Sequence, residues 1–151
     1  MSELLQVFLT VISGVLIFVT GQILIKFFIE PYQDQCKLIG EIADSIIYYA
    51  NIICSPTNGK GLSKDKLIEY QEAKDDLRQK SSMLRSRTHL IPAYDYLSKI
   101  KLVISKKDID IASRNLMAIS KNLLINMKDA SSKNLEWRDE IIKVLKLPKN
   151  I

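Results

Sequence analysis

The chain has 151 residues, of which 22 are Lys or Arg and 17 are Asp or Glu, so its formal net charge is +5. Positions 31–151 carry 21 basic and 15 acidic residues, a net charge of +6. A segment of this length holds one modest hydrophobic core, so we expect one soluble domain. Its basic character suits a nucleotide, a nucleic acid or an anionic lipid surface as partner, and equally a domain that stays beside the cytoplasmic leaflet.

Cysteine and histidine usage argues against a disulfide framework and a metal site. Cys36 and Cys54 are the only cysteines. They belong to one helical pattern, which separates them by about 27 Å, too far for an intrachain bridge. A single histidine and two distant cysteines do not supply the three or four ligands of a zinc site. No metal and no cofactor are predicted.

The first 30 residues are predicted to form a transmembrane helix. Leu4 to Ile25 are 22 residues without a charge, long enough to span a bilayer. A cleavable signal peptide would need a positive start and a small-residue cleavage site, whereas Glu3 is the only early side-chain charge. Lys26 and Lys37 follow the span and no Lys or Arg precedes it, which predicts an external N-terminus and a cytoplasmic domain over 31–151.

Polar residues within the span follow a 4-3-7 spacing along one side of the helix, a seam formed by Gln6, Thr10, Ser13 and Thr20. Such a seam lets helices approach closely and exchange hydrogen bonds, so it predicts parallel self-association. In the alternative, the hydroxyl groups bond to carbonyl groups of their own helix and the span is monomeric.

The rest of the chain shows helical periodicity and no alternating strand pattern, so the predicted fold is all-α: a single N-terminal transmembrane helix followed by a small cytoplasmic helical bundle. Pro31 begins a new helix or kinks the old one. A Gly-containing break at 55–63 is a linker, although its Asn58-Gly-Lys-Gly61 core could form a phosphate nest. Ser105 to Asp108 reads as a capping box. The expected helices are 32–54, 64 to about 86, 92–102, 106–127 and 135–145.

A basic cluster with nearby tyrosines is the best candidate anion or nucleotide site. Arginine binds phosphate bidentately, histidine can donate to it, and tyrosine stacks on bases. The candidate ligand-binding residues are Arg78, Arg85, Arg87, His89 and Tyr94. In the alternative interpretation, the basic residues complement the dipole at the end of a helix.

An enzyme is the less favoured class. Helical HEPN ribonucleases place four to six residues between an arginine and a histidine, whereas Arg85 and His89 enclose three and Arg87 and His89 enclose one. The chain has no second histidine and no Gly-rich elbow around a serine. We therefore predict a protein without catalytic residues.

Several segments resemble a family of small bacterial proteins with one N-terminal transmembrane helix. They are Gly21-Gln-Ile-Leu-Ile-Lys-Phe-Phe-Ile-Glu-Pro31, Lys37-Leu-Ile-Gly-Glu-Ile-Ala43, Ile47-Tyr-Tyr-Ala-Asn51, Leu84-Arg-Ser-Arg-Thr-His-Leu-Ile-Pro-Ala-Tyr94 and Ile109-Asp-Ile-Ala-Ser-Arg-Asn-Leu-Met-Ala-Ile-Ser-Lys-Asn-Leu123. The layout is similar to that of the membrane-bound ancillary effectors of type III CRISPR systems that bind cyclic tetra-adenylate. This resemblance implies a homotetramer in the bacterial inner membrane that presents four basic sites to a cyclic oligoadenylate.

The predicted function is therefore that of an oligomeric sensor that binds cyclic oligoadenylate and perturbs the inner membrane in antiphage defence. Two alternatives remain. A membrane adaptor would recruit a protein partner through the apolar faces of 32–54 and 135–145. A HEPN-like ribonuclease would degrade RNA and would depend on His89.

Overall fold

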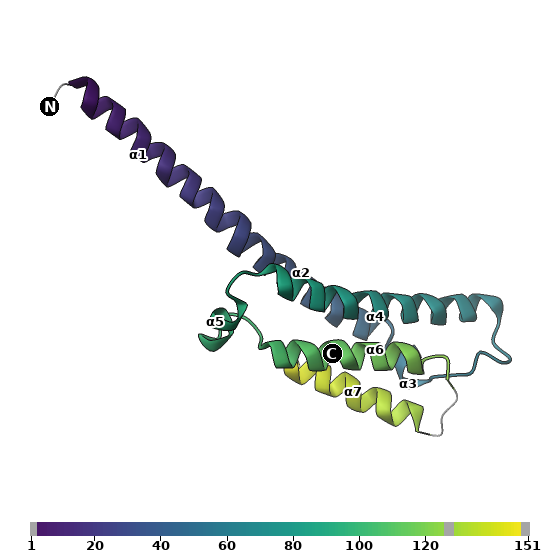
Figure 1. Ribbon diagram of the computed structural model, residues 1–151. Helices are drawn as coiled ribbons and strands as arrows, with labels where there is room; N and C mark the ends of the chain where they lie inside the picture. Colours follow the sequence, from purple (N-terminus) through teal and green to yellow (C-terminus); the bar gives the residue numbers. More distant parts are fainter. Residues whose placement is uncertain (1–2, 126–128, 149–151) are drawn as a thin grey trace.

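The regular structure is entirely helical over the residues that the computed structural model describes, 3–125 and 129–148 (Figure 1). The predicted all-α class is confirmed. In chain order the elements are α1 (Glu3–Leu24), the π-helical turn η1 (Ile25–Ile29), α2 (Glu30–Tyr48), α3 (Ala50–Cys54), α4 (Lys64–Leu90), α5 (Tyr94–Lys99), α6 (Lys106–Asn122) and α7 (Ala130–Val144).

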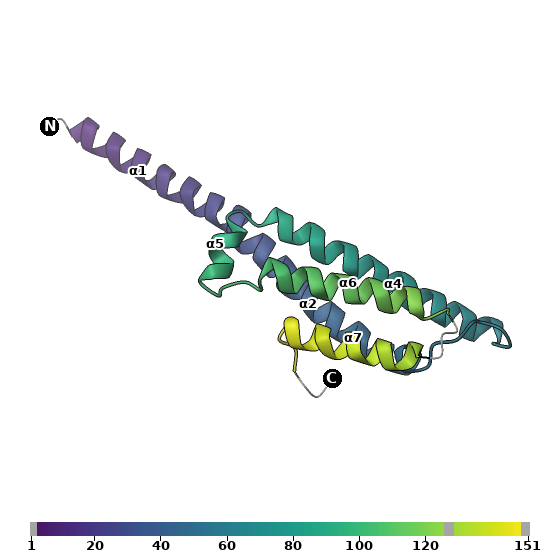
Figure 2. The ribbon, with the colours of Figure 1, turned by 60° about the horizontal axis from the view of Figure 1, so that its bottom comes forward.

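The first three elements form one continuous helix of 46 residues, Glu3–Tyr48. Its N-terminal part is apolar and long enough to cross a membrane, and no residue of α1 is buried by the rest of the described chain. Figures 1 and 2 show α1 projecting away from the other helices. By length and composition, α1 is the candidate membrane span.

Pro31 lies within this long helix instead of ending it. Proline lacks an N–H group, and its ring collides with the carbonyl group four residues earlier in a regular α-helix. The turn just before it, η1, is π-helical, and the Glu30 N–H group donates to the Ile25 carbonyl five residues back. This wider turn accommodates the ring, because the carbonyl groups ahead of Pro31 are no longer in α-helical register.

The hydrophobic core lies between α2, α4, α6 and α7. On α4 the buried residues are three or four positions apart, the spacing that places side chains on one face, whereas α6, which packs against both α4 and α7, buries a broader face. Figures 1 and 2 both show α4 and α6 side by side, with α7 along the opposite side of α6. The largest fully buried apolar side chains are Leu38, Ile42, Ile46, Ile53, Leu77, Leu84, Ile109, Leu116, Ile119, Leu123 and Ile141.

Several predicted helix boundaries differ from the structure, including those of the helices predicted over 92–102 and 135–145, which span Tyr94–Lys99 and Ala130–Val144. The predicted helix over 32–54 is divided at Tyr49, whose φ and ψ of −94° and 16° end α2. The helix predicted to end near position 86 continues to Leu90, because Pro92 constrains its predecessor Ile91 to the extended region (φ −85°, ψ 114°). The helix predicted to reach Met127 ends at Asn122, and Met127 itself lies outside the described residues.

The cap predicted at Ser105 is confirmed, and the structure adds a cap at Ser63 that was not predicted. The Ser105 hydroxyl oxygen accepts a bond from the Asp108 backbone N–H (3.1 Å) and donates to the Asp108 carboxylate (2.7 Å). Ser63 caps α4 through a single bond, in which its hydroxyl oxygen accepts from the Lys66 backbone N–H. Each cap satisfies an otherwise unpaired donor at a helix start, so it fixes where the helix begins.

Candidate functional site

The site lies where α4 and α6 pack against each other. At the crossing, the Ser81 hydroxyl donates to the Ser113 carbonyl oxygen (2.8 Å), and the Ser113 hydroxyl donates to the Ser81 carbonyl oxygen (2.9 Å). Both serines are buried. Because these side chains are small and bond to each other's backbone, the two helices pack with little between them, and longer side chains nearby border an open groove.

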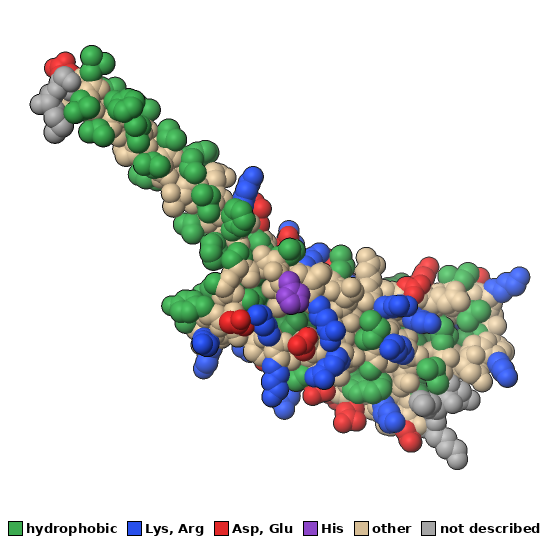
Figure 3. Space-filling model, viewed as in Figure 1, with side chains coloured by type: hydrophobic (Ala, Val, Ile, Leu, Met, Phe, Trp, Pro, Cys, Tyr) green, Lys and Arg blue, Asp and Glu red, His purple; other side chains and the backbone are tan. Residues whose placement is uncertain are grey.

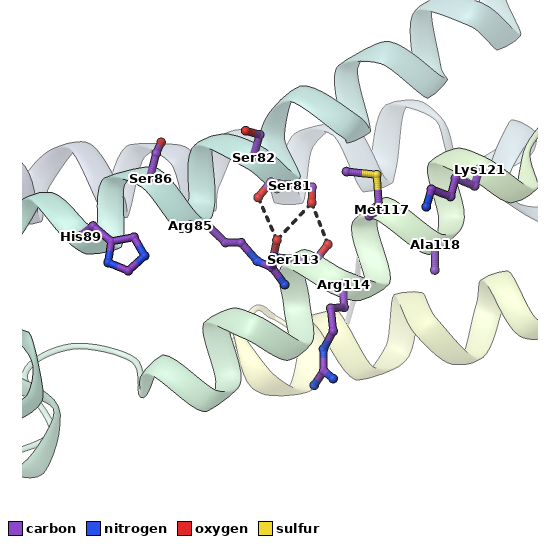
Figure 4. A pocket seen from close by; sticks show the side chains of 10 residues that line it. All are labelled: Ser81, Ser82, Arg85, Ser86, His89, Ser113, Arg114, Met117, Ala118 and Lys121. Carbon is purple, nitrogen blue, oxygen red and sulfur yellow. Dashed lines mark hydrogen bonds between the residues drawn. The ribbon is translucent and has the colours of Figure 1, made fainter.

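This groove has a volume of about 680 Å³ and runs along the exposed side of the α4–α6 pair. Figure 4 shows Arg85 reaching from α4 toward α6, with His89 one turn farther along α4. Residues of α4 line one side and residues of α6 the other. They are Ser81, Ser82, Arg85, Ser86, His89, Ser113, Arg114, Met117, Ala118 and Lys121.

The groove is basic. Arg85, Arg114 and Lys121 line it, and a hollow that continues from it is lined by Arg85, Arg114, Lys107 and Asp110. Asp110 is the one carboxylate among these lining residues, and its Oδ1 atom lies 3.5 Å from Arg85 Nε. Figure 3 shows Lys and Arg side chains gathered near the histidine on this face. The excess of positive charge favours an anionic ligand.

The structure brings two of the five predicted ligand-binding residues into this groove. Arg85 and His89 both line it. Arg78 is exposed on α4 two turns before Arg85, outside the lining. Arg87 faces α2, where its guanidinium donates to the Asp34 carbonyl oxygen. The contact made by Arg87 ties the end of α4 to the start of α2.

Tyr94 lies inside the protein, with 3% of its surface exposed. Its hydroxyl donates to the Ile104 carbonyl oxygen (2.7 Å) and accepts a bond from the Gln35 amide nitrogen (3.0 Å), which also donates to Thr88 (3.0 Å). Burial raises the pKa of Tyr94. Since its ring is enclosed, Tyr94 supports the loop beside the groove and offers no stacking face to a ligand.

Sequence reasoning selected none of the five lining residues that come from α6, which are Ser113, Arg114, Met117, Ala118 and Lys121. A signal for Arg114, Met117 and Lys121 exists in the sequence. Positions 107, 110, 114, 117 and 121 recur at intervals of three and four on one side of the predicted helix, and three of them are basic. That stripe resembles an ordinary solvated face until its position beside α4 is known.

The hydroxyl groups of the predicted seam in α1 bond within their own helix. Thr10 donates to the Gln6 carbonyl oxygen (2.9 Å), Ser13 to the Leu9 carbonyl oxygen (2.8 Å), and Thr20 to the Leu16 carbonyl oxygen (2.8 Å). This is the arrangement expected of the alternative in which the hydroxyl groups bond to carbonyl groups of their own helix and the span is monomeric. The hydroxyl oxygens retain lone pairs, and the whole seam is exposed on α1.

Comparisons with known proteins identified no relative. The chain matches no protein-family model, no curated protein and no solved structure. Within 3–125 and 129–148, no three His, Cys, Asp or Glu side chains lie close enough together to hold a metal ion.

Proposed function

We propose that this protein is a membrane-anchored oligomeric sensor that binds a cyclic oligoadenylate, cyclic tetra-adenylate, in the α4–α6 groove and perturbs the bacterial inner membrane in antiphage defence of the type III CRISPR kind. The observation that carries the proposal is the groove itself, in which Arg85, Arg114, Lys121 and His89 line one open surface. Guanidinium groups bind phosphate oxygens through paired, charge-assisted hydrogen bonds, and the serine hydroxyls can bond to ribose or base edges.

The ligand explains why an oligomer is required. A cyclic tetranucleotide carries four equivalent phosphates, whereas one chain supplies a single groove. A ring of four chains presents four equivalent grooves, so each phosphate meets the same arginines, and the symmetry of the ligand matches that of the protein. We place the tetramer contacts partly in the membrane, along the seam of Gln6, Thr10, Ser13 and Thr20.

A signal can pass from the groove to the span through contacts at the end of α4. Arg87 bonds to the Asp34 carbonyl oxygen, and Thr88 bonds to Gln35, so α4 is attached to the first turns of α2. α2 is continuous with α1. Ligand binding shifts this assembly only if it favours one arrangement over another, at about 1.4 kcal/mol for each tenfold preference.

The proposed topology places the groove where a nucleotide messenger is made. Lys26 and Lys37 follow the apolar run, so the N-terminus lies outside and the helical domain lies in the cytoplasm. Loss of membrane integrity is the proposed output, because the apolar α1 projects from the bundle (Figure 1) and is long enough to cross a membrane.

The test uses the full chain in lipid nanodiscs and in dye-loaded vesicles. We expect cyclic tetra-adenylate to bind with one ligand per four chains by calorimetry, and to release dye from the vesicles. Linear tetra-adenylate is the control for shape. Absence of binding by a folded, membrane-inserted sample would refute the proposal. A saturable protein partner would then favour the adaptor, and RNA cleavage lost on changing His89 would favour the ribonuclease.

A further inference from the structure

The segment around α5 exposes four large apolar side chains within 13 residues. Leu90 is 67% exposed, Tyr96 65%, Ile100 49% and Leu102 60%. The other exposed large apolar residues beyond the start of α2 are spread over several parts of the bundle; they are Ile47, Tyr48, Ile68 and Ile125. The 90–102 segment therefore carries the largest group of exposed apolar side chains in the described bundle. Figure 3 shows apolar side chains at the corresponding end of the bundle. An apolar surface of this kind marks a contact with a partner or a membrane.

The position of the segment identifies the partner. Tyr94, the first residue of α5, bonds to Gln35 (3.0 Å), and Arg87 bonds to Asp34 just before the loop. Gln35 is six residues beyond the last residue of η1, a helical rise of about 9 Å from the end of the apolar stretch. Figures 1 and 2 both show α5 beside the end of α1 that enters the bundle. With α1 in a bilayer, α5 therefore lies at the level of the lipid headgroups.

Charge on the segment matches an anionic surface. Lys99 and Lys101 are exposed among the apolar residues, whereas Asp95, the only carboxylate in α5, is paired with Lys106 (2.9 Å). Lysine beside exposed apolar side chains places its stem on the acyl region and its ammonium group among phosphates.

The turn after α5 holds these residues on the surface. Leu102 N–H donates to the Leu97 carbonyl oxygen, and Lys101 N–H donates to the Ser98 carbonyl oxygen, each at 3.0 Å. Lys101 has a φ of 61°, a left-handed conformation that is usually occupied by glycine at the end of a helix. Glycine here would relieve the strain but remove the ammonium group. Lysine at this position places a positive charge between Ile100 and Leu102.

We propose that Leu90 and the 94–102 segment dock on an anionic lipid surface, with Tyr96, Ile100 and Leu102 at the boundary of headgroups and acyl chains and Lys99 and Lys101 against lipid phosphates. The contact fixes the bundle at a second point beside the span, so the domain lies against the membrane. It concerns residues outside the α4–α6 groove and does not depend on the identity of the groove's ligand.

Tryptophan fluorescence of the full chain in vesicles tests this docking. Trp137 is the only tryptophan, so a Trp137→Phe background leaves one probe at a time. Tyr96→Trp places the probe in the segment, and Ile68→Trp places it at 51% exposure near the start of α4, the opposite end of that helix. In phosphatidylglycerol vesicles with brominated acyl chains, we expect a blue-shifted and quenched probe at position 96 and an unquenched probe at position 68.

The lysines are tested by lipid charge and by substitution. Each lysine near an anionic surface favours docking about fivefold, so Lys99→Gln and Lys101→Gln should each lower the ratio of docked to undocked probe by about that factor. Replacing phosphatidylglycerol by phosphatidylcholine, which carries no net charge, should likewise reduce the quenching of the probe at position 96. An unquenched probe at position 96, or equal quenching at positions 96 and 68, would overturn the docking. Equal quenching in both lipids would overturn the role assigned to the lysines.

Discussion

Opposite changes in the charge of the groove give the sharpest test of the proposed site. Arg85 and Asp110 lie on facing helices, with Nε and Oδ1 3.5 Å apart, and both line the same basic hollow. Arg85→Ala removes a phosphate donor. Asp110→Asn keeps the size and shape of the side chain but removes the negative charge beside that donor. If the groove binds an anion, the two substitutions change the affinity for cyclic tetra-adenylate in opposite directions.

The magnitudes follow from the exposure of the pair. Hydrogen bonds to a charged partner contribute about 1.5–3 kcal/mol, so Arg85→Ala should weaken binding roughly 10-fold to 150-fold. A phosphate bound to the far side of the guanidinium lies roughly 7 Å from Asp110. With the two side chains 50% and 60% exposed, a dielectric near that of water applies. The repulsion removed by Asp110→Asn is then about 0.6 kcal/mol, about a threefold gain in affinity.

Calorimetry on the full chain in nanodiscs measures both effects. Arg138→Ala is the matched control, because it removes the same charge from α7, where Arg138 pairs with Asp139 (2.8 Å) outside the groove lining. Its affinity should stay close to that of the natural chain. An exposed ion pair contributes at most about 1 kcal/mol to stability, so the Arg85→Ala and Asp110→Asn variants should remain folded. The Arg138 side chain is 24% exposed, so the folding of Arg138→Ala is checked by its thermal unfolding curve. Raising the salt concentration should shrink the difference between Arg85→Ala and Asp110→Asn.

Two results would refute the electrostatic reasoning. Equal weakening by Arg85→Ala and Asp110→Asn would mean that Asp110 orients the arginine, so the ion pair and not the net charge determines binding. Equal weakening by Arg85→Ala and Arg138→Ala would mean that the ligand responds to total charge and that the groove is not the site.

Three further predictions concern stability and assembly. Tyr94→Phe should destabilise the fold by about 1–2 kcal/mol, because the Gln35 amide and the Ile104 carbonyl lose a buried partner. Since burial raises the pKa of Tyr94, its contribution is complete below pH 10 and is lost as the pH rises through the folded-state pKa, so the variant should show a shallower alkaline loss of stability. Lys146→Gly should raise the melting temperature by about 2–4 °C, because Lys146 has a left-handed φ of 55° after α7. Gln6→Leu should weaken self-association roughly 3-fold to 30-fold, whereas Gln22→Leu, on the opposite side of α1, should not.

Each of these predictions has a direct measurement. Chemical unfolding in detergent from pH 7 to 11 tests Tyr94→Phe, and an unchanged alkaline slope would contradict the role given to its hydroxyl. Thermal unfolding tests Lys146→Gly, where a lower melting temperature would show that the lysine side chain contributes more than the left-handed backbone costs. Light scattering across protein concentrations measures self-association. Equal association of the Gln6→Leu and Gln22→Leu variants would refute the role of the seam in it.

The sequence by itself determined the class of structure and the candidate membrane span. Apolar residues at intervals of three and four leave helices as the only regular way to gather them on one face, and 22 uncharged residues suffice to cross a bilayer. The helix cap at Ser105 could also be predicted from the sequence. A short hydroxyl side chain followed three positions later by an acidic residue can pair with an N–H group of the first helical turn. These features depend on neighbours a few residues apart.

Tertiary structure alone decided which basic residues share a surface. Helical periodicity shows which side of α4 or α6 is buried but not which helix packs there, so Arg114 and Lys121 could not be assigned to the same groove as Arg85 and His89. The orientation of Arg87 and Tyr94 likewise depends on Asp34 and Gln35, more than 50 positions away. The groove exists because Ser81 and Ser113 allow two helices distant in sequence to approach closely, a contact that local propensity does not specify.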